Sequence, residues 1–462
     1  MVLVPRIVTL IPAVMLFSAL ISDAQPATGP LRICQANPRY FTEESGKAIY
    51  LTGSHTWPNL VDLGPTDPPP VFDYNAYLDF MQKHQHNFMR MWTWELTSWD
   101  TRGNKENQLH TAIPHPWARS GSGKALDGKP KFNLKQYDPA YFDRLRARVT
   151  VARDRGIYVS IMLFEGWGLQ FSPDAWKSHP FNRRNNVNGI DGDKNQDGMG
   201  LEVHELVDPK VTALQEAYVK KVVDTVNDLD NVLYEISNEN HPPSTSWQYH
   251  FIDFIHQYEK SKPKQHPVGM TFQYKGGSNK ALFDSPAEWI APNDEGGYRD
   301  NPPAGDGRKV ILNDTDHLWG MGGNPAWVWK SFLRGLNPLF MDPYDAVVLG
   351  TADESKWEPI RKNLGYTLRM AKRMALTEMV PKNDLASSGY CLANPGKEYL
   401  VFLPNGESVT VDLSAVSGSV STEWFNPQTG ETQPGPQSAG GEKRAYSSPF
   451  GKQDTALYLK VM

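Results

Sequence analysis

The stretch NVLYEISNENH (231–241) joins an apolar run to an Asn-Glu pair. The run has the length and composition of a buried strand, and Asn238 and Glu239 stand where that strand ends. Side chains alternate between the two faces of a strand, so Glu239 shares a face with Glu235. We therefore expect Glu235 deep in the fold and Glu239 at its edge. There it suits general acid/base chemistry beside an amide donor, and a solvated loop glutamate is the alternative.

Seven other apolar, β-rich runs are expected to form strands like this one. The eight predicted strands are 49–57, 87–95, 158–168, 231–239, 266–274, 288–294, 309–317 and 337–344. Helical patterns cover 71–85, 137–156, 209–229 and 356–379. Strands that alternate with helices indicate parallel pairing, and eight such units predict an α/β fold of the (β/α)8 TIM-barrel type. An open doubly wound sheet is the alternative, but GSHTWPNL (53–60) is not the Gly-rich phosphate turn expected there.

The ends of the chain differ from this central part. The N-terminus has one Arg, an apolar run over 7–21 and small residues before Ala24, which predicts a signal peptide at 1–24. No later run is long enough to span a bilayer, so we expect a secreted or periplasmic protein without a membrane partner. The barrel is expected over 30–385. Short alternating strands broken by Pro-Gly-Asn turns predict a small C-terminal β-sandwich over 388–462.

Composition narrows the class of partner. The 462-residue chain has a formal net charge of -5 without a clustered basic face, which argues against a nucleic-acid partner. Its 14 Trp, 19 Tyr and 19 Phe exceed what the core needs, and flat rings stack on sugars. Ordinary core packing is the alternative role for these rings. We expect a carbohydrate partner, and we expect the protein to be a monomer. Cys34 and Cys391 are either bridged or two separate buried thiols.

A partner carboxylate for Glu239 is expected at the end of the seventh strand. KVILNDTDH (309–317) has Asp314 and Asp316 on one face. Asp314 aligns with the strand end and is the first candidate for the nucleophile or second carboxylate, and Asp316 is the second. Capping of the following segment is the alternative role for each.

The second strand supplies a cation and aromatic rings. NFMRMWTWE (87–95) places Arg90, Trp92 and Trp94 on one face. An inward Arg needs a carboxylate partner because an unpaired buried charge is costly, and it would lower the pKa of that carboxylate. A surface Arg beside core Trp residues is the alternative. The remaining substrate-binding candidates at strand ends are Asn238, His55, Trp57, Glu165, Trp167, Tyr274 and His317.

These features together resemble the clan A glycoside hydrolases. NPRYFTEESGKAIYLTGSHTWPNL (37–60), FMRMW (88–92) and YEISNE (234–239) are more closely similar to a family-140-like group. That group joins a cellulase-like barrel to a C-terminal domain labelled collagen-binding, and LVFLPNGESVTVDLS (400–414) and EWFNPQTGE (423–431) resemble this second domain.

The resemblance implies a glycoside hydrolase in which Glu239 is the acid/base, with Asn238 and Arg90 in the clan's corresponding positions. The clan usually has Glu on the seventh strand, where this chain has Asp314 or Asp316. The resemblance favours a retaining mechanism, and the shorter side chain leaves inversion open. A carbohydrate-binding protein on an inactive barrel is the alternative function. A metal-dependent hydrolase ranks last, because it would need a His-rich ligand set.

One loop has the spacing of calcium ligands. NGIDGDKNQDGMG (188–200) carries oxygen-bearing side chains at every second position, namely Asp191, Asp193, Asn195 and Asp197. From Asp193 it matches D-x-N-x-D-G, but position twelve is His204 instead of a bidentate Glu. A structural calcium ion and a solvated polar turn are both consistent with this pattern. No cofactor is expected to be required for the reaction.

Overall fold

The computed structural model describes residues 25–100, 109–171, 173–344, 349 and 354–462. The predicted signal peptide, 1–24, lies outside the described residues. Among the helices within them, none combines the length and apolar character needed to cross a membrane.

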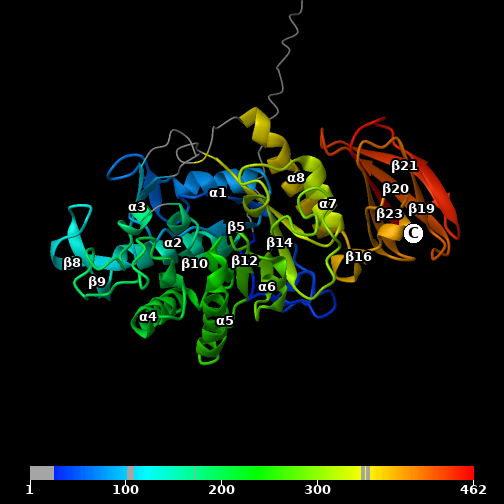
Figure 1. The fold of residues 1–462 in the computed structure, drawn as a ribbon. Coiled ribbons are helices and arrows are strands. Elements are labelled where there is room, and N and C mark those ends of the chain that lie inside the picture. The colour runs from blue at the N-terminus through cyan, green and yellow to red at the C-terminus, as the bar shows by residue number, and fades with distance from the viewer. Residues whose placement is uncertain (1–24, 101–108, 172, 345–348, 350–353) are drawn as a thin grey trace, which may run out of the picture.

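Eight parallel strands form a barrel at the centre of the larger domain (Figure 1). Around the barrel they are β3 (Gly53–His55), β15 (Asn337–Met341), β14 (Val310–Asp314), β13 (Trp289–Ala291), β12 (Val268–Thr271), β11 (Val232–Asn238), β10 (Tyr158–Glu165) and β5 (Phe88–Met91). The barrel closes between β3 and β5, where the Asn87 amide donates to the Thr52 carbonyl oxygen at 3.0 Å. The predicted TIM barrel and all eight of its strands are confirmed, although each strand is shorter than its apolar run.

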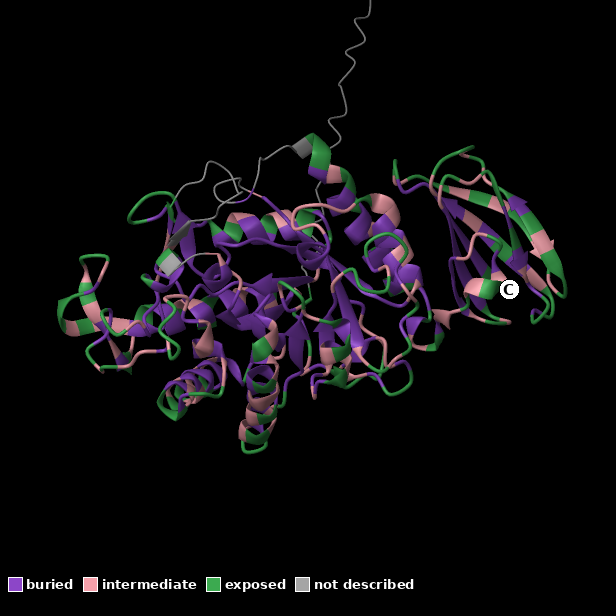
Figure 2. Cartoon of the chain, viewed as in Figure 1, coloured by how far each residue is buried: buried purple, intermediate pink, exposed green. Residues whose placement is uncertain are grey.

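Helices cover the outside of the barrel. They are α1 (Tyr74–Lys83), α2 (Pro139–Asp154), α3 (Pro173–Trp176), α4 (Pro209–Val226), α5 (Thr245–Glu259), α6 (Asn279–Asp284), α7 (Pro325–Leu333) and α8 (Glu354–Arg373). Local sequence fixes several starts: Asp138 and Asp208 each cap a helix that begins with Pro. Figure 2 shows buried residues along the barrel strands and exposed residues on the outer helix faces.

Short antiparallel strands lie outside the eight-stranded barrel. They are β1 (Arg32–Ile33) with β2 (Phe41–Thr42), β4 (Asp62–Gly64) with β7 (Leu109–Ile113) and β6 (Ser98–Asp100), and β8 (Trp117–Lys124) with β9 (Pro130–Tyr137). The described parts of the segment between β5 and α2, 96–100 and 109–136, thus contribute the antiparallel strands β6 to β9.

The C-terminal domain is a sandwich of antiparallel strands, as predicted. One sheet contains β16 (Val380–Pro381), β17 (Cys391–Asn394), β18 (Glu398–Leu403), β23 (Thr455–Val461), β20 (Ser419–Phe425) and β21 (Thr432–Ala439). The other pairs β19 (Ser408–Asp412) with β22 (Lys443–Ser447). Val401, Val409, Val411 and Leu457 are buried in the core of this domain.

The outer face of the larger sheet packs against the barrel helices α7 and α8. Trp329 of α7 lies between the domains, with ring centroids 6.0 Å from Phe402 and 5.4 Å from Phe425. Its indole N–H donates to Asn363 at 2.8 Å, and the Asn363 amide donates to the Pro427 carbonyl oxygen at 3.0 Å. A hydrophobic cluster that is separate from the two domain cores therefore joins α7 and α8 to the sandwich.

The two cysteines are separate. Cys34 and Cys391 are both buried free thiols, which is the second of the two arrangements left open by the sequence. Burial raises the pKa of the Cys391 thiol to about 12, so this thiol is unreactive at neutral pH.

The junction makes a prediction about stability. Phe402→Ala should lower the free energy of unfolding by about 3–5 kcal/mol, because it leaves a cavity beside Trp329. Val71→Ala is the control: Val71 is 83% exposed, and its loss should change stability by less than about 0.5 kcal/mol. Urea unfolding followed by tryptophan fluorescence measures both. Equal effects of the two substitutions would show that the junction does not stabilise the fold.

Candidate active site

Arg90 is fully buried at the centre of a carboxylate network. Its Nε and Nη2 atoms donate to the two oxygens of Glu235 at 2.9 and 2.6 Å. Its Nη1 atom donates to Asp314 at 3.1 Å and to Asp316 at 2.9 Å. The Nη2 atom also donates to Asn238 Oδ1 at 2.5 Å. The guanidinium of Arg90, on β5, thus joins side chains from β11 and from the end of β14. The prediction that Arg90 faces inward and pairs with a carboxylate is confirmed.

Asp314 lies deep in this network and is held by His55. The His55 Nε2 atom is 2.9 Å from Asp314, and Trp92 Nε1 donates to His55 Nδ1 at 2.9 Å. Because an indole N–H can only donate, His55 accepts at Nδ1 and donates to Asp314 through Nε2. Burial alone would raise the pKa of Asp314, but His55 and Arg90 hold it below its ordinary range. Asp314 also caps the amide of Asp316 at 3.0 Å.

Glu239 and Asp316 face a common cavity of about 570 Å³. Glu239 has a φ of 43°, an uncommon value for a residue with a side chain. Its carbonyl oxygen accepts from Gln170 Nε2 at 2.7 Å, which fixes the turn at the end of β11. Asp316 lies in a 3₁₀ turn, Thr315–His317, that directly follows β14. Glu235 is completely buried below Glu239, in agreement with the predicted strand alternation.

The two cavity carboxylates differ in their partners. Burial and then the neighbouring Asp316 raise the pKa of Glu239 well above its ordinary value, and within the described residues no cation contacts Glu239 directly. Burial and Asp314 also raise the pKa of Asp316, but Arg90 opposes this shift through a direct contact at 2.9 Å. Glu239 is therefore the carboxyl group that keeps its proton, and Asp316 is the one stabilised as an anion.

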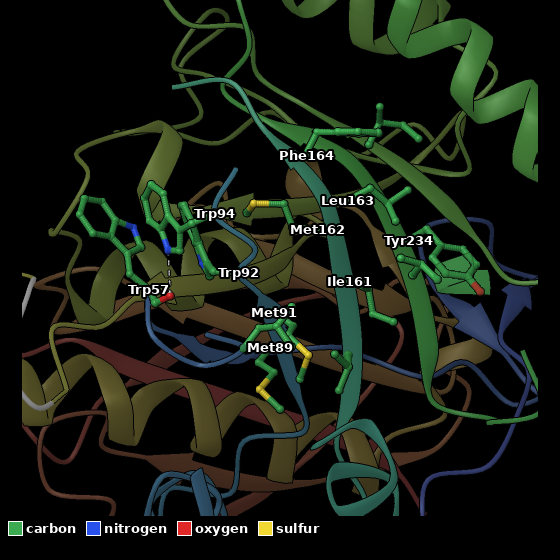
Figure 3. Close-up of a cluster of buried hydrophobic side chains, with 14 of the residues drawn as sticks. Trp57, Met89, Met91, Trp92, Trp94, Ile161, Met162, Leu163, Phe164 and Tyr234 are labelled. Carbon is green, nitrogen blue, oxygen red and sulfur yellow. Dashed lines mark hydrogen bonds between the residues drawn. The ribbon is translucent and has the colours of Figure 1, made fainter. Parts of the chain in front are cut away.

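Aromatic rings line much of the cavity. The Trp57 ring centroid is 5.8 Å from that of Trp92 and 5.5 Å from that of Trp167. Trp94 packs behind them, and its indole N–H donates to the Trp57 carbonyl oxygen at 3.2 Å (Figure 3). The cavity is lined by Trp57, Trp92, Trp167, Asn238, Glu239, Phe272, Tyr274, Arg299, Asp316, His317, Leu318, Trp319, Gly320, Met321, Met341 and Leu349.

Several predicted site residues lie behind the cavity wall instead of lining it. These are His55, Arg90, Trp94, Asp314 and Glu165, each of them buried. His55, Arg90 and Asp314 still act on the cavity through Trp92 and Asp316. Trp94 is displaced because β5 ends at Met91, so strand alternation no longer governs its direction.

Five cavity residues were not singled out from the sequence although they carry distinctive side chains. They are Phe272, Arg299, Trp319, Met321 and Met341. Phe272 follows β12 directly and could have been found from its strand-end position. Arg299, Trp319 and Met321 come from loops without periodicity, and no sequence signal marked them.

His317 and Asn238 complete the polar side of the cavity. Asn238 Oδ1 accepts from Arg90, which leaves its amide N–H groups directed away from the cation. His317 Nε2 lies 3.4 Å from Asn238 Oδ1 and 3.6 Å from Asp316. Burial, with help from Arg90, lowers the pKa of His317 to about 3, so this ring is neutral. Both side chains can hydrogen-bond a hydroxyl-rich ligand beside the two carboxylates.

A second carboxylate pair lies behind Trp167. Glu95 accepts from His204 at 2.9 Å and lies 3.4 Å from His179. Although burial opposes it, these two rings lower the pKa of Glu95 to about 2. Glu165 has no cation among its described partners and accepts from the backbone amides of Trp167 and Gly168. Burial, Glu95 and Asp316 raise its pKa to about 8.

The loop with calcium-like spacing forms a polar turn. Asp193 accepts from the Gly198 amide at 3.0 Å, and Asp197 accepts from the Met199 amide at 2.7 Å. Asn195 donates to Asp197 at 3.0 Å. Across the described ranges, no group of three or more His, Cys, Asp or Glu side chains is placed to hold a metal ion. Calcium binding here stays a prediction.

Two family models match parts of the chain. The model described as "Domain of unknown function (DUF6298)" matches residues 106–278. The model described as "Putative collagen-binding domain of a collagenase" matches residues 377–460. No curated protein matches the sequence.

Solved structures of similar fold cover both domains. A glycoside hydrolase family 5 structure from Bacteroides vulgatus has a TM-score of 0.61 at 14% identity, covering 95% of this chain and 95% of that chain. A structure described as a glycoside hydrolase has a TM-score of 0.59 at 12% identity, with 94% and 97% covered. A further glycoside hydrolase structure from Bacteroides vulgatus, described as putative, has a TM-score of 0.61 at 10% identity, with 95% and 83% covered. At these identities the likeness establishes the fold.

The network makes a prediction for Arg90. Arg90→Met should lower the free energy of unfolding by about 3–5 kcal/mol, because Glu235, Asp314 and Asp316 lose their shared cation. Arg146→Gln, which breaks an exposed pair with Asp228, is the control and should cost less than about 1 kcal/mol. Urea denaturation at pH 7 compares the two variants. A loss no larger than that of the control would contradict the central role of Arg90.

Glu165 makes a prediction about pH. Its pKa is raised from 4.5 to about 8, so the folded state binds a proton that the unfolded state releases. This group's contribution to stability is complete below about pH 4.5 and is lost as pH rises through 8. Glu165→Gln should therefore lose less stability than the wild type between pH 5 and pH 9, as measured by thermal unfolding. Glu431→Gln, at an exposed position, is the control and should keep the wild-type pH dependence of stability. A wild-type pH dependence in Glu165→Gln would contradict the raised pKa of Glu165.

Proposed function

We propose that the chain is a secreted glycoside hydrolase of the clan A type that cleaves an O-glycosidic bond in a poly- or oligosaccharide. The observation that carries the proposal is that Glu239 and Asp316 line one aromatic-lined cavity and that, among the described residues, Arg90 makes a direct ion pair with Asp316 but not with Glu239. The apolar N-terminal segment supports export. The narrower likeness to the family-140-like group rests on the stretches at 37–60, 88–92 and 234–239 and on the C-terminal domain.

Glu239 is suited to be the general acid. Its raised pKa keeps a proton available at neutral pH, and the carboxyl group faces the cavity. In the first step, this proton passes to the glycosidic oxygen as the bond from that oxygen to the anomeric carbon breaks. The leaving sugar departs as an alcohol, and Glu239 becomes a carboxylate that can later accept a proton from water.

Asp316 is suited to be the second carboxylate, in preference to Asp314. Both are buried, but only Asp316 lines the cavity, whereas Asp314 is held by His55 and Arg90 behind it. In a retaining reaction, Asp316 bonds to the anomeric carbon, and water then cleaves this ester with Glu239 as base. His55 and Asp314 act as positioning residues, since they fix Arg90, which in turn orients Asp316.

The walls account for sugar binding. The rings of Trp57, Trp92 and Trp167 offer apolar faces for a pyranose or furanose ring. The Asn238 amide is placed to donate to a hydroxyl beside the bond being cleaved. This mechanism requires no cofactor, and a calcium ion at 188–200 would have a structural role away from the reaction.

The proposal predicts the kinetics of two substitutions. Release of reducing sugar is measured on β-mannan, β-xylan, β-glucan, arabinogalactan and polygalacturonan. On the polymer that is cleaved, Glu239→Gln and Asp316→Asn should each reduce kcat by about 10³-fold or more, because each removes a group that acts on the reacting bond. Activity of the wild type should fall as pH rises through the elevated pKa of Glu239 and as pH falls through that of Asp316.

The control is Glu216→Gln, which alters an outer pair with His250 and should keep near-normal turnover. Circular dichroism shows whether each variant is folded. Turnover of Glu239→Gln close to that of the control would refute the role of Glu239. Binding to a polymer without release of reducing sugar would instead favour a carbohydrate-binding protein on an inactive barrel.

A further inference from the structure

A second cavity lies at the junction between the barrel and the sandwich. Its volume is about 710 Å³, which is within the range of ligand-binding pockets and above that of the catalytic cavity. The barrel contributes the beginning of α7, including Asn324, and part of α8, including Pro359. The sandwich contributes loops that carry Asn405, Gln428 and Gln453. Neither domain alone forms this cavity.

The lining combines amide side chains and proline rings with two lysines and two acidic residues, Glu358 and Asp454, so its formal charges balance. The amide side chains of Asn405 and Gln428 make no hydrogen bond to any residue that the structure describes, so they are available to a ligand. The lysines of the cavity are balanced: Lys362 lies 3.5 Å from Glu358, and Lys452 lies 3.7 Å from Glu407. A ligand rich in hydroxyl groups and without net charge fits such a surface, because amides both donate to and accept from hydroxyls.

Some residues that line the second cavity are close in sequence to residues that line the catalytic cavity. The segment after β14 lines the catalytic cavity through Met321 and the second cavity from Asn324 onward. Two residues lie between these positions, so their Cα atoms are at most about 11 Å apart. The loop after β14 also carries Asp316, so both cavities open near the end of the barrel that holds the two carboxylates.

We propose that the junction cavity is a distal carbohydrate-binding site, which holds one part of a neutral polysaccharide while another part of the same chain occupies the catalytic cavity. This inference rests on the proposed function and extends it to the substrate: a polymer attacked within the chain. It also assigns the sandwich a role in binding glycan through Asn405, Gln428 and Gln453.

The test uses the full-length protein with the inactivating Glu239→Gln substitution, so that binding is measured without cleavage. Affinity gel electrophoresis is run with β-mannan, β-xylan, β-glucan and arabinogalactan. Asn405→Gly and Gln428→Ala are combined, with Gly chosen because Asn405 has a φ of 48°. Gln437→Ala, at an exposed site on β21 outside the cavity, is the matched control.

The double variant should bind the retained polymer about tenfold more weakly than its parent, and the control should bind it equally well. In the active enzyme, the ratio of kcat/KM on that polymer to kcat/KM on its shortest cleaved oligosaccharide should fall about tenfold, mainly through KM. An unchanged ratio together with normal cleavage would overturn this inference and leave the hydrolase proposal intact.

Two other results would also overturn the distal site. One is the absence of binding to every polymer of the series by the Glu239→Gln protein. The other is binding of a triple-helical Gly-Pro-Pro peptide that is lost in the double variant, which would make the junction a collagen site. Failure of the hydrolase proposal is seen separately, as cleavage that persists in Glu239→Gln.

Discussion

The guanidinium of Arg90 is the constraint on which the arrangement of the site depends. It contacts Glu235 on β11, Asp314 on β14 and Asp316 in the turn after β14, so one positive charge serves three buried carboxylates. A further negative charge nearby would be costly in a low-dielectric interior. Of the two cavity carboxylates, Glu239 is the one without a direct contact to that cation, and its pKa is raised well above its ordinary value. The charge balance of the buried network and the acid role proposed for Glu239 therefore have a common cause.

Much of this arrangement could be predicted from the sequence, because it follows from strand periodicity. Alternation along 231–239 gave the depth of Glu235 and the outward position of Glu239, and alternation along 87–95 gave an inward Arg90. The same rule failed where a strand ended early. Since β14 stops at Asp314 and a 3₁₀ turn follows, Asp316 turns into the cavity and Asp314 does not. Arg299 and Trp319 come from irregular loops, where no alternation of side chains predicts which residues face the cavity.

Glu95 and Glu165 show that the hydrogen-bond donors around a buried glutamate decide whether it is charged. Both are buried and adjacent, since the Glu165 amide donates to Glu95 at 3.0 Å. Glu95 receives donors from His179 and His204 and has a pKa of about 2, whereas Glu165 has only backbone donors and a pKa of about 8. The two imidazoles also tie the loop between β10 and α4 to the barrel wall. Trp167 at the beginning of that loop is thereby fixed against Trp57.

The C-terminal sandwich belongs to the same argument about positioning. Trp329 sits in the middle of α7, and its burial against Phe402 and Phe425 fixes that helix relative to the sandwich. The N-terminal end of α7 continues from the segment that carries Asp316. A domain packed on α7 therefore restrains the loop that carries Asp316, although none of its described side chains lines the cavity of Glu239 and Asp316. The hydrophobic contact at Trp329 holds the sandwich in this position. Its loops at the junction therefore lie beside the end of the barrel that carries Glu239 and Asp316.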